Sequence, residues 1–199
     1  MVRMVGILTL KFAPPASLND LEDNQLVALA RRGQDEAFDE LVRRHSPRVH
    51  AVCSRIVGRE EAYDVVQDAF LAAYRAIGTF RQEAQFSTWL HRIALNCCYA
   101  RTRKHPDLSH DIQAPTEHPE TTDSPLEIAE RRDLRAALEK ALAKLKPDFR
   151  ETFVLVEFGN LDYAAAAEVL NIEVGTVKSR MNRARASLRE ILEGWGYAP

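Results

Sequence analysis

The sequence predicts an all-helical protein of two small domains joined by an acidic linker. Apolar residues recur at the helical period of about 3.6 residues over residues 20–104 and again over 126–195. No alternation of period two persists anywhere, and residues 105–125 show neither pattern. We therefore expect a flexible leader at 1–18, a first domain at 19–105, a linker at 106–125 and a second domain at 126–199.

The first domain is predicted to contain four helices. Two amphipathic helices are separated near Gly33, with Asp20 and Asp35 as the expected N-caps. A third helix runs from about residue 60 to residue 77. The fourth begins near Ser87, which is its expected N-cap.

The linker lies in the stretch "HPDLSHDIQAPTEHPETTDSP", residues 105–125. It holds four prolines and five acidic residues but no lysine or arginine. Because proline removes backbone donors and apolar residues are few, we expect an extended, solvated chain. Its three histidines lack a Cys or Glu partner at metal-ligand spacing, so we expect no metal site there.

The second domain carries a predicted helix-turn-helix in "LDYAAAAEVLNIEVGTVKSRMNRARASLREIL", residues 161–192. Tyr163 to Leu170 would form the first helix, "NIEVG" the turn, and Thr176 the N-cap of the second helix. One apolar stripe on the second helix must face the domain core. It consists of Val177, Met181, Ala184, Leu188 and Ile191.

The opposite side of this second helix is polar and basic. It presents Ser179, Asn182, Arg183 and Ala186, flanked by Lys178, Arg180, Arg185 and Arg189, and no acidic residue occurs from 176 to 189 although the chain has a net charge of -2. A helix in the major groove needs small or hydrogen-bonding side chains toward the bases and cations beside them for the phosphates. We predict DNA contacts from this helix; a solvated basic face is the alternative. The predicted contacts are Thr176, Lys178, Ser179, Arg180, Asn182, Arg183 and Arg185.

Composition excludes several other classes of protein. The near-zero net charge argues against a chain that coats nucleic acid or membranes without specificity. The apolar stretch at residues 4–10 ends at Lys11 and "FAPPA" after it is a poor cleavage signal, so we expect a flexible leader rather than a secretion signal. No apolar run approaches the roughly 20 residues that span a bilayer. The three cysteines, Cys53, Cys97 and Cys98, form no C-x-x-C spacing, which favours a reducing, cytoplasmic location.

An enzyme is not predicted. The sequence contains no Gly-rich phosphate loop, no nucleophile motif and no H-E-x-x-H metal site. We therefore expect no catalytic residues, no cofactor, no metal and no small-molecule substrate.

Several motifs in order resemble one family. "EEAYDVVQDAFLAAYRAIGTF" resembles region 2.2, "FSTWLHRIALNCCYARTRK" resembles regions 2.3 and 2.4, and "LDYAAAAEVLNIEVGTVKSRMNRARASL" resembles region four of the extracytoplasmic-function sigma factors of bacterial RNA polymerase. The resemblance covers residues 19–192. It implies a dissociable polymerase subunit that recognises promoters. Its implied partners are core RNA polymerase, promoter DNA and an anti-sigma factor, often membrane-anchored.

In the third predicted helix, Asp64, Gln67 and Asp68 share one face and suit a basic partner helix. The resemblance implies that this partner is the clamp coiled coil of the largest polymerase subunit. A solvated helix face is the alternative.

The loop "TFRQEAQ", residues 79–85, resembles the loop that captures a flipped base of the melted non-template strand. Arg81, Gln82 and Gln85 are the candidates for this contact. We expect Phe86 and Trp89 to belong to the core rather than to stack on bases.

The helix after this loop ends in a second basic patch that could follow the DNA backbone. The patch comprises Arg92, Asn96, Arg101, Arg103 and Lys104. The alternative is a soluble helix end whose cations complement the helix dipole.

One feature departs from the resemblance. "AAAA" at residues 164–167 departs from the family pattern, which has acidic residues at the first two of these positions, so the placement of this helix is less defined. The resemblance also implies that the linker threads near the RNA exit path of the polymerase. An inert tether is the alternative.

Two rival functions remain. One is a helix-turn-helix response regulator, which would need a receiver domain, and the other is a sigma-like decoy that binds a partner without DNA.

Overall fold

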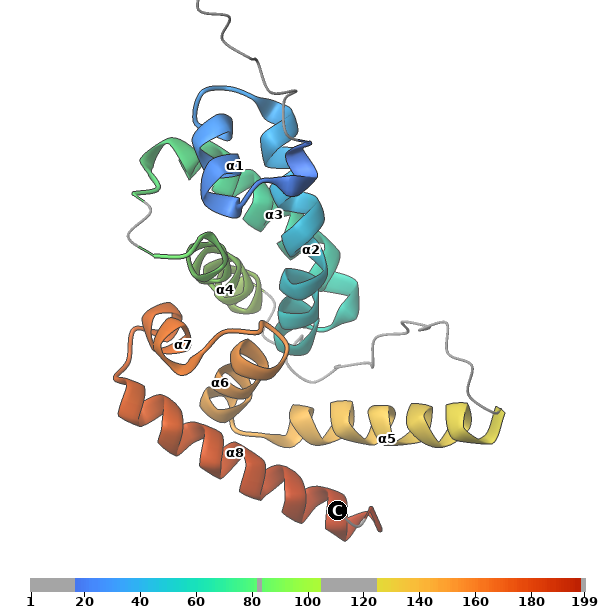
Figure 1. Cartoon of the computed structure of the whole chain (residues 1–199). Helices are drawn as coiled ribbons and strands as arrows, with labels where there is room; N and C mark the ends of the chain where they lie inside the picture. Colours follow the sequence, from blue (N-terminus) through green and yellow to red (C-terminus); the bar gives the residue numbers. More distant parts are fainter. Residues whose placement is uncertain (1–16, 82–83, 105–124, 198–199) are drawn as a thin grey trace, which may run out of the picture.

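The computed structural model describes residues 17–81, 84–104 and 125–197, with side chains from residue 131 onward in the last range, and this part of the chain is helical without strands (Figure 1). The all-helical prediction is confirmed. The leader before residue 17 and the predicted linker lie outside the described residues. The elements are η1 (Leu18–Asp20), α1 (Asp23–Ala30), α2 (Asp35–Val57), α3 (Arg59–Ala76), η2 (Ile77–Thr79), α4 (Phe86–Lys104), α5 (Pro125–Lys144), α6 (Pro147–Glu157), α7 (Tyr163–Leu170) and α8 (Val174–Gly194).

Helices α1 to α4 form the first domain around one apolar core. Leu26, Leu41, Val49 and Leu90 are completely buried, and Phe86 is 1% exposed. Helices α2 and α3 are joined by Gly58 alone, whose φ of 89° is a conformation that side-chain-bearing residues rarely adopt. This one-residue turn folds α3 back along α2.

Three predicted N-caps of the first domain are wrong by one or two residues. Glu22 caps α1 through a reciprocal capping box with Gln25, while Asp20 lies in η1. Asp35 is the first residue of α2, and its carboxylate accepts a hydrogen bond from the Tyr74 hydroxyl at 2.7 Å instead of capping. Ser87 lies inside the first turn of α4. Of the three side chains, that of Asp35 is engaged by a tertiary contact.

The three cysteines contribute to packing. Cys53 and Cys98 are buried and Cys97 is half-buried, all as free thiols. A hydrogen bond with Cys53, together with burial, raises the pKa of Cys98, and burial raises the pKa of Cys97. Thiols with raised pKa values are poor nucleophiles, so the environment does not activate Cys97 or Cys98.

Helices α6, α7 and α8 form the core of the second domain. Val177, Met181 and Ala184 are completely buried and Leu188 is 5% exposed, so the predicted apolar stripe of α8 does face the core. Ile191, the last member, is half-buried. Burial of this stripe fixes which face of α8 is left for a ligand.

The two domains pack against each other. Helix α7 lies beside α4, and α5 and α6 contact α2 (Figure 1). The sequence contained no pattern that predicts this contact, because it joins faces that each helix alone would present to solvent.

His91 of α4 lies at this contact and is 1% exposed. Its Nδ1 donates a hydrogen bond to the Ser87 carbonyl at 2.7 Å, whereas its Nε2 has no partner among the described residues. A Cβ atom at Gly159 would lie 3.2 Å from this Nε2, so glycine allows the loop after α6 to approach the ring. Burial lowers the pKa of His91, as do the nearby positive charges of His45 and Arg48.

We predict that Met181→Ala lowers the free energy of unfolding by about 2 to 5 kcal/mol, because it opens a cavity in a completely buried site. Urea titration followed by circular dichroism measures this loss. Asn182→Ala, at the neighbouring exposed position, should change stability by less than about 0.5 kcal/mol. Equal losses for the two variants would contradict the assignment of the buried face.

We predict that His91 contributes a loss of stability as pH falls below its ordinary pKa of 6.5. Because its folded pKa is lowered, the unfolded chain takes up the proton first and is favoured by acid. Urea titrations at about pH 7 and about pH 5.5, a window placed around this ordinary pKa, should give a smaller acid loss for His91→Asn than for the wild type. The comparison cancels the carboxylates common to both proteins. An identical acid loss in both would show that His91 does not titrate in this window.

Candidate nucleic-acid interface

The helix-turn-helix is built from short local signals. The Asp162 carboxylate accepts a hydrogen bond from the Ala165 amide at 2.7 Å and caps α7, which ends at Asn171 in the left-handed conformation with φ of 54°. The predicted bounds of α7 are confirmed. The predicted N-cap Thr176 is wrong: extended backbone at Glu173 starts α8 at Val174, and Thr176 lies in its first turn.

The predicted DNA-reading side of α8 is open to solvent. Ser179, Asn182, Arg183 and Ala186 are all exposed, and so are the flanking Lys178 and Arg189. In the described part of the chain, no ion pair involves Lys178, Arg183 or Arg189. These cations are therefore available to phosphates.

Two other cations of α8 are held by α6. Arg180 pairs with Asp148 at 2.7 Å, and Arg185 pairs with Glu157 at 2.9 Å. Exposed pairs of this kind contribute little stability, so DNA phosphates can compete for both arginines. Both arginines lie on α8 next to its exposed face, so their side chains can reach a ligand bound there.

The residues predicted to form the second basic patch lie on different sides of α4. Arg101 forms ion pairs with Glu61 and with Asp64, both on α3, the latter at 3.1 Å. Arg92 points the other way and donates to the carbonyl oxygen of Glu168 at 2.8 Å and to its carboxylate at 3.2 Å. Asn96, Arg103 and Lys104 are exposed. The five residues therefore do not form one continuous face, and Arg101 in particular is turned toward α3.

The loop before α4 rests on an aromatic cluster. Phe80 and Phe86 are buried, and the half-buried Trp89 lies with its ring centroid 4.9 Å from that of Phe80 and 5.7 Å from that of Phe86. This packing places Phe86 in the core as predicted and Trp89 at its edge. Arg81 and Gln85 are exposed beside this cluster, and the third candidate, Gln82, lies outside the described residues.

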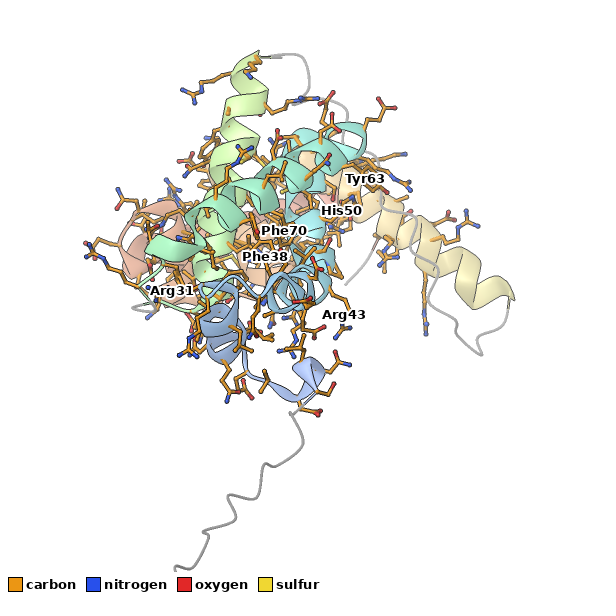
Figure 2. The ribbon with its side chains drawn as sticks, turned by 90° about the horizontal axis from the view of Figure 1, so that it is seen from above. Arg31, Phe38, Arg43, His50, Tyr63 and Phe70 are labelled. Carbon is orange, nitrogen blue, oxygen red and sulfur yellow. The ribbon has the colours of Figure 1, made fainter. Side chains whose placement is uncertain are left out.

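The acidic face of α3 borders an apolar groove that the sequence did not reveal. Asp64, Gln67 and Asp68 are exposed, as predicted for one helix face. Beside them α2 and α3 enclose a groove of about 500 Å³ whose lining includes Phe38, Val42, Tyr63, Phe70, Leu71 and Tyr74, with Asp35, Asp39 and Gln67 among its polar members. Figure 2 shows Phe38 and Phe70 next to each other along this groove, with Tyr63 farther along near His50.

Large apolar side chains of this groove remain in contact with solvent. Tyr63 is 61% exposed, and Leu71 and Tyr74 are each 46% exposed. Exposed aromatic and leucine side chains gathered in one groove are typical of protein-binding surfaces. The position of Leu71 and Tyr74 on α3, outside its buried stripe, was the sequence signal that could have identified it.

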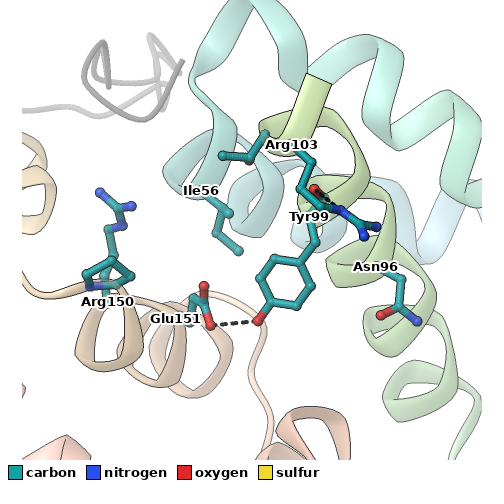
Figure 3. Close-up of a pocket in the computed structure, with 8 residues that line it drawn as sticks. Ile56, Asn96, Tyr99, Arg103, Arg150 and Glu151 are labelled. Atoms are coloured by element: carbon teal, nitrogen blue, oxygen red, sulfur yellow. Dashed lines mark hydrogen bonds between the residues drawn. The ribbon is translucent and has the colours of Figure 1, made fainter. Parts of the chain in front are cut away.

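A second cavity, of about 730 Å³, lies between the domains (Figure 3). It is lined by Asn96, Tyr99 and Arg103 of α4 and by Arg150 and Glu151 of α6, among others. The Tyr99 hydroxyl donates to the Glu151 carboxylate at 2.7 Å, and burial raises the pKa of both groups. Two predicted DNA-contacting residues, Asn96 and Arg103, thus border the other domain.

Neither a metal site nor a membrane span is found in the described ranges. They contain no group of three or more His, Cys, Asp or Glu side chains placed to hold a metal ion. None of their helices is both long and apolar enough to cross a bilayer.

Two family models match the chain, sigma-70 region 2 over residues 41–106 and sigma-70 region 4 over residues 135–188. The RNA polymerase sigma-H factor of Pseudomonas aeruginosa is 36% identical over 188 residues, which cover 88% of this chain and 96% of that protein. The ECF RNA polymerase sigma-E factor of Escherichia coli K12 is 35% identical over 179 residues, covering 84% and 93%.

Solved structures agree with these matches. CnrH, solved in complex with the cytosolic domain of CnrY, has a TM-score of 0.67 and 31% identity over 86% of this chain and 97% of its own. The sigma factor RpoE of Bartonella quintana, solved with the anti-sigma factor NepR, shares the fold with a TM-score of 0.64 and 24% identity, covering 78% and 96%. The chain therefore belongs to the extracytoplasmic-function (ECF) sigma factors of bacterial RNA polymerase.

Proposed function

We propose that this ECF sigma factor directs polymerase to its promoters through three separate surfaces. Helix α8 binds the upstream promoter element, the α2–α3 groove binds core polymerase, and α4 with the preceding loop holds melted promoter DNA. The observation that carries the proposal is α8, because its apolar stripe is buried in the domain while its opposite side is exposed and basic, with no carboxylate on the helix between residues 176 and 189. A decoy that binds no DNA would have no use for that face.

On α8, side chains of different chemistry divide the work of DNA binding. Asn182 and Arg183 are exposed at the middle of the open face and suit base edges, since amides pair with adenine and guanidinium with guanine. Lys178, Arg180 and Arg185 lie beside them for phosphates. Thr176, Ser179 and the turn before α8 position this helix in the major groove of the DNA.

Core polymerase would bind the α2–α3 groove. Its apolar floor offers anchors for the partner's side chains, and Asp64, Gln67 and Asp68 border it with negative charge and an amide. A basic amphipathic helix, such as the clamp coiled coil implied by the family, satisfies both features. The acidic rim orients the partner and the apolar floor supplies most of the affinity.

Melted DNA would lie along α4. Arg92, Asn96, Arg103 and Lys104 would follow its backbone, with Arg101 placed at the α3 side, and Arg81, Gln82 or Gln85 would take a flipped base. The aromatic cluster of Phe80, Phe86 and Trp89 gives this loop a rigid base.

We further propose control by an anti-sigma factor, membrane-anchored as in many members of the family, because the 31% identical CnrH is solved with the cytosolic domain of a partner protein.

We predict that Leu71→Glu weakens binding to core polymerase about tenfold or more, because it places a charge in the apolar groove. Since Leu71 is 46% exposed, the fold should tolerate the change. Biolayer interferometry with immobilised core polymerase measures the affinity, and Arg31→Ala, at the exposed residue that follows α1 and lies outside the groove, is the control. Unchanged affinity for Leu71→Glu would remove the groove from the polymerase interface.

We predict that Arg183→Glu abolishes site-selective open-complex formation with core polymerase on a library of promoter fragments. Loss of one base-contacting arginine costs about 1 to 3 kcal/mol, and the added negative charge repels the phosphates. Permanganate reactivity of melted thymines gives the measurement, and Arg132→Glu on α5 is the matched charge reversal.

Two results of this library experiment would overturn the proposed function. DNA binding without core polymerase, together with full activity of Leu71→Glu, would indicate a free-standing regulator. Core binding without any DNA melting by the wild type would indicate a decoy.

A further inference from the structure

The cavity between the domains has the size of a small-molecule site. Its walls come from three helices, with Ile56 on α2, Tyr99 and Arg103 on α4, and Arg150 and Glu151 on α6. Its volume of about 730 Å³ lies within the range of about 300 to 1,000 Å³ that is usual for ligand pockets. It shares no lining residue with the α2–α3 groove, so it is a separate feature of the molecule.

One wall of this cavity contains a buried cation without an opposite charge. Arg150, in the first turn of α6, is 6% exposed and forms no ion pair with the described residues. Its Nη1 donates to the Ala143 carbonyl over a long 3.5 Å, and its Nε has no hydrogen-bond partner. The other buried arginine at the domain contact, Arg55 of α2, is paired with Glu139 of α5 at 2.5 Å. Because buried arginines are normally paired in this way, Arg150 lacks an anion.

The adjacent carboxylate of Glu151 does not supply that anion. It accepts a hydrogen bond from the Tyr99 hydroxyl at 2.7 Å, and burial raises the pKa of Glu151. Figure 3 shows this hydrogen bond between Arg150 on one side and Asn96 on the other. The charged side chains that line the cavity are therefore two arginines and one carboxylate, which leaves an excess of positive charge.

The remaining walls suit an apolar body. The side chain of Ile56, the ring of Pro147 and the ring of Tyr99 contribute apolar surface. Asn96 and Arg103 are exposed and add hydrogen-bond donors at the solvent side. An apolar lining with a few polar groups at defined positions is typical of sites for small organic molecules.

We propose that this cavity binds a small organic anion, whose carboxylate pairs with Arg150 and whose flat apolar body lies against Tyr99 and Ile56. A guanidinium matches a carboxylate through two parallel hydrogen bonds, which gives the site its selectivity for acids. The ligand contacts α4 of the first domain and α6 of the second, so its binding stabilises their packing. The inference goes beyond the proposed function and does not depend on it.

The experiment uses the full chain without polymerase or DNA. The probe is 2-naphthoate, and its matched control is 2-naphthamide, which has the same ring system without the charge. A titration followed by ¹H–¹⁵N NMR with assigned amides reports both the affinity and the position of the bound probe.

We expect saturable binding of 2-naphthoate with a Kd of about 1 mM or below, as is usual for a ligand of this size. The largest shift changes should fall on Tyr99, Arg103 and Glu151, and not on Leu71 or Tyr74 of the α2–α3 groove. We expect 2-naphthamide to bind about tenfold more weakly or worse, because it cannot neutralise Arg150.

Arg150→Met tests the assigned cation. It keeps an unbranched side chain but removes a buried charge that has no carboxylate partner, so the fold should tolerate it. We expect it to lower the affinity for 2-naphthoate about tenfold or more, whereas Arg132→Met, at an exposed position on α5, leaves the affinity unchanged. If circular dichroism shows that Arg150→Met unfolds, Asn96→Trp replaces it, because an indole at this exposed lining residue should block the cavity and cause a similar loss.

Four results would each overturn the site. They are no saturable binding of 2-naphthoate, equal affinities for 2-naphthoate and 2-naphthamide, shift changes centred on the α2–α3 groove, and an unchanged affinity in a folded Arg150→Met or Asn96→Trp variant. None of them bears on the proposed function, which open-complex formation with core polymerase tests separately.

Discussion

Burial of one apolar stripe on each amphipathic helix is the constraint on which this structure depends. In α8, the stripe of Val177, Met181, Ala184 and Leu188 fixes the rotation of the helix about its axis. Everything that faces outward, including Asn182 and Arg183, is then determined by helical geometry. The buried stripe of α3 fixes the rotation of that helix in the same way, and it leaves Asp64, Asp68 and Leu71 at the surface.

Charge pairing separates the cations of the chain into two groups. Most described arginines outside α8 that lie near carboxylates are engaged, as Arg43 and Arg44 are with Glu40, whose pKa falls to about 2 through these hydrogen bonds. On the open face of α8, Arg183 has no such partner in the described part of the chain. A near-neutral protein can thus present one basic surface to DNA without binding nucleic acid everywhere.

Packing of the two domains engages one residue that the family resemblance assigns to DNA. Arg92 donates to the carbonyl end of α7, because a guanidinium that suits a phosphate also suits a helix C-terminus. The desolvation cost of the domain contact is concentrated in Arg55 and Glu139. Because both charges are buried, removal of either side chain would leave the other without its opposite charge.

The sequence by itself determined the helical class, the bounds of α7, the buried stripe of α8 and its basic face, because all of these follow from local periodicity. It also sufficed to identify the family through motifs in order. Tertiary structure decided what local patterns do not encode: the apolar groove between α2 and α3, and the partners on α3 and α7 that engage Arg101 and Arg92 of α4. The packing of one domain on the other belongs to this second group as well. A groove or an interface combines residues far apart in the chain, so no periodicity within either helix could reveal it.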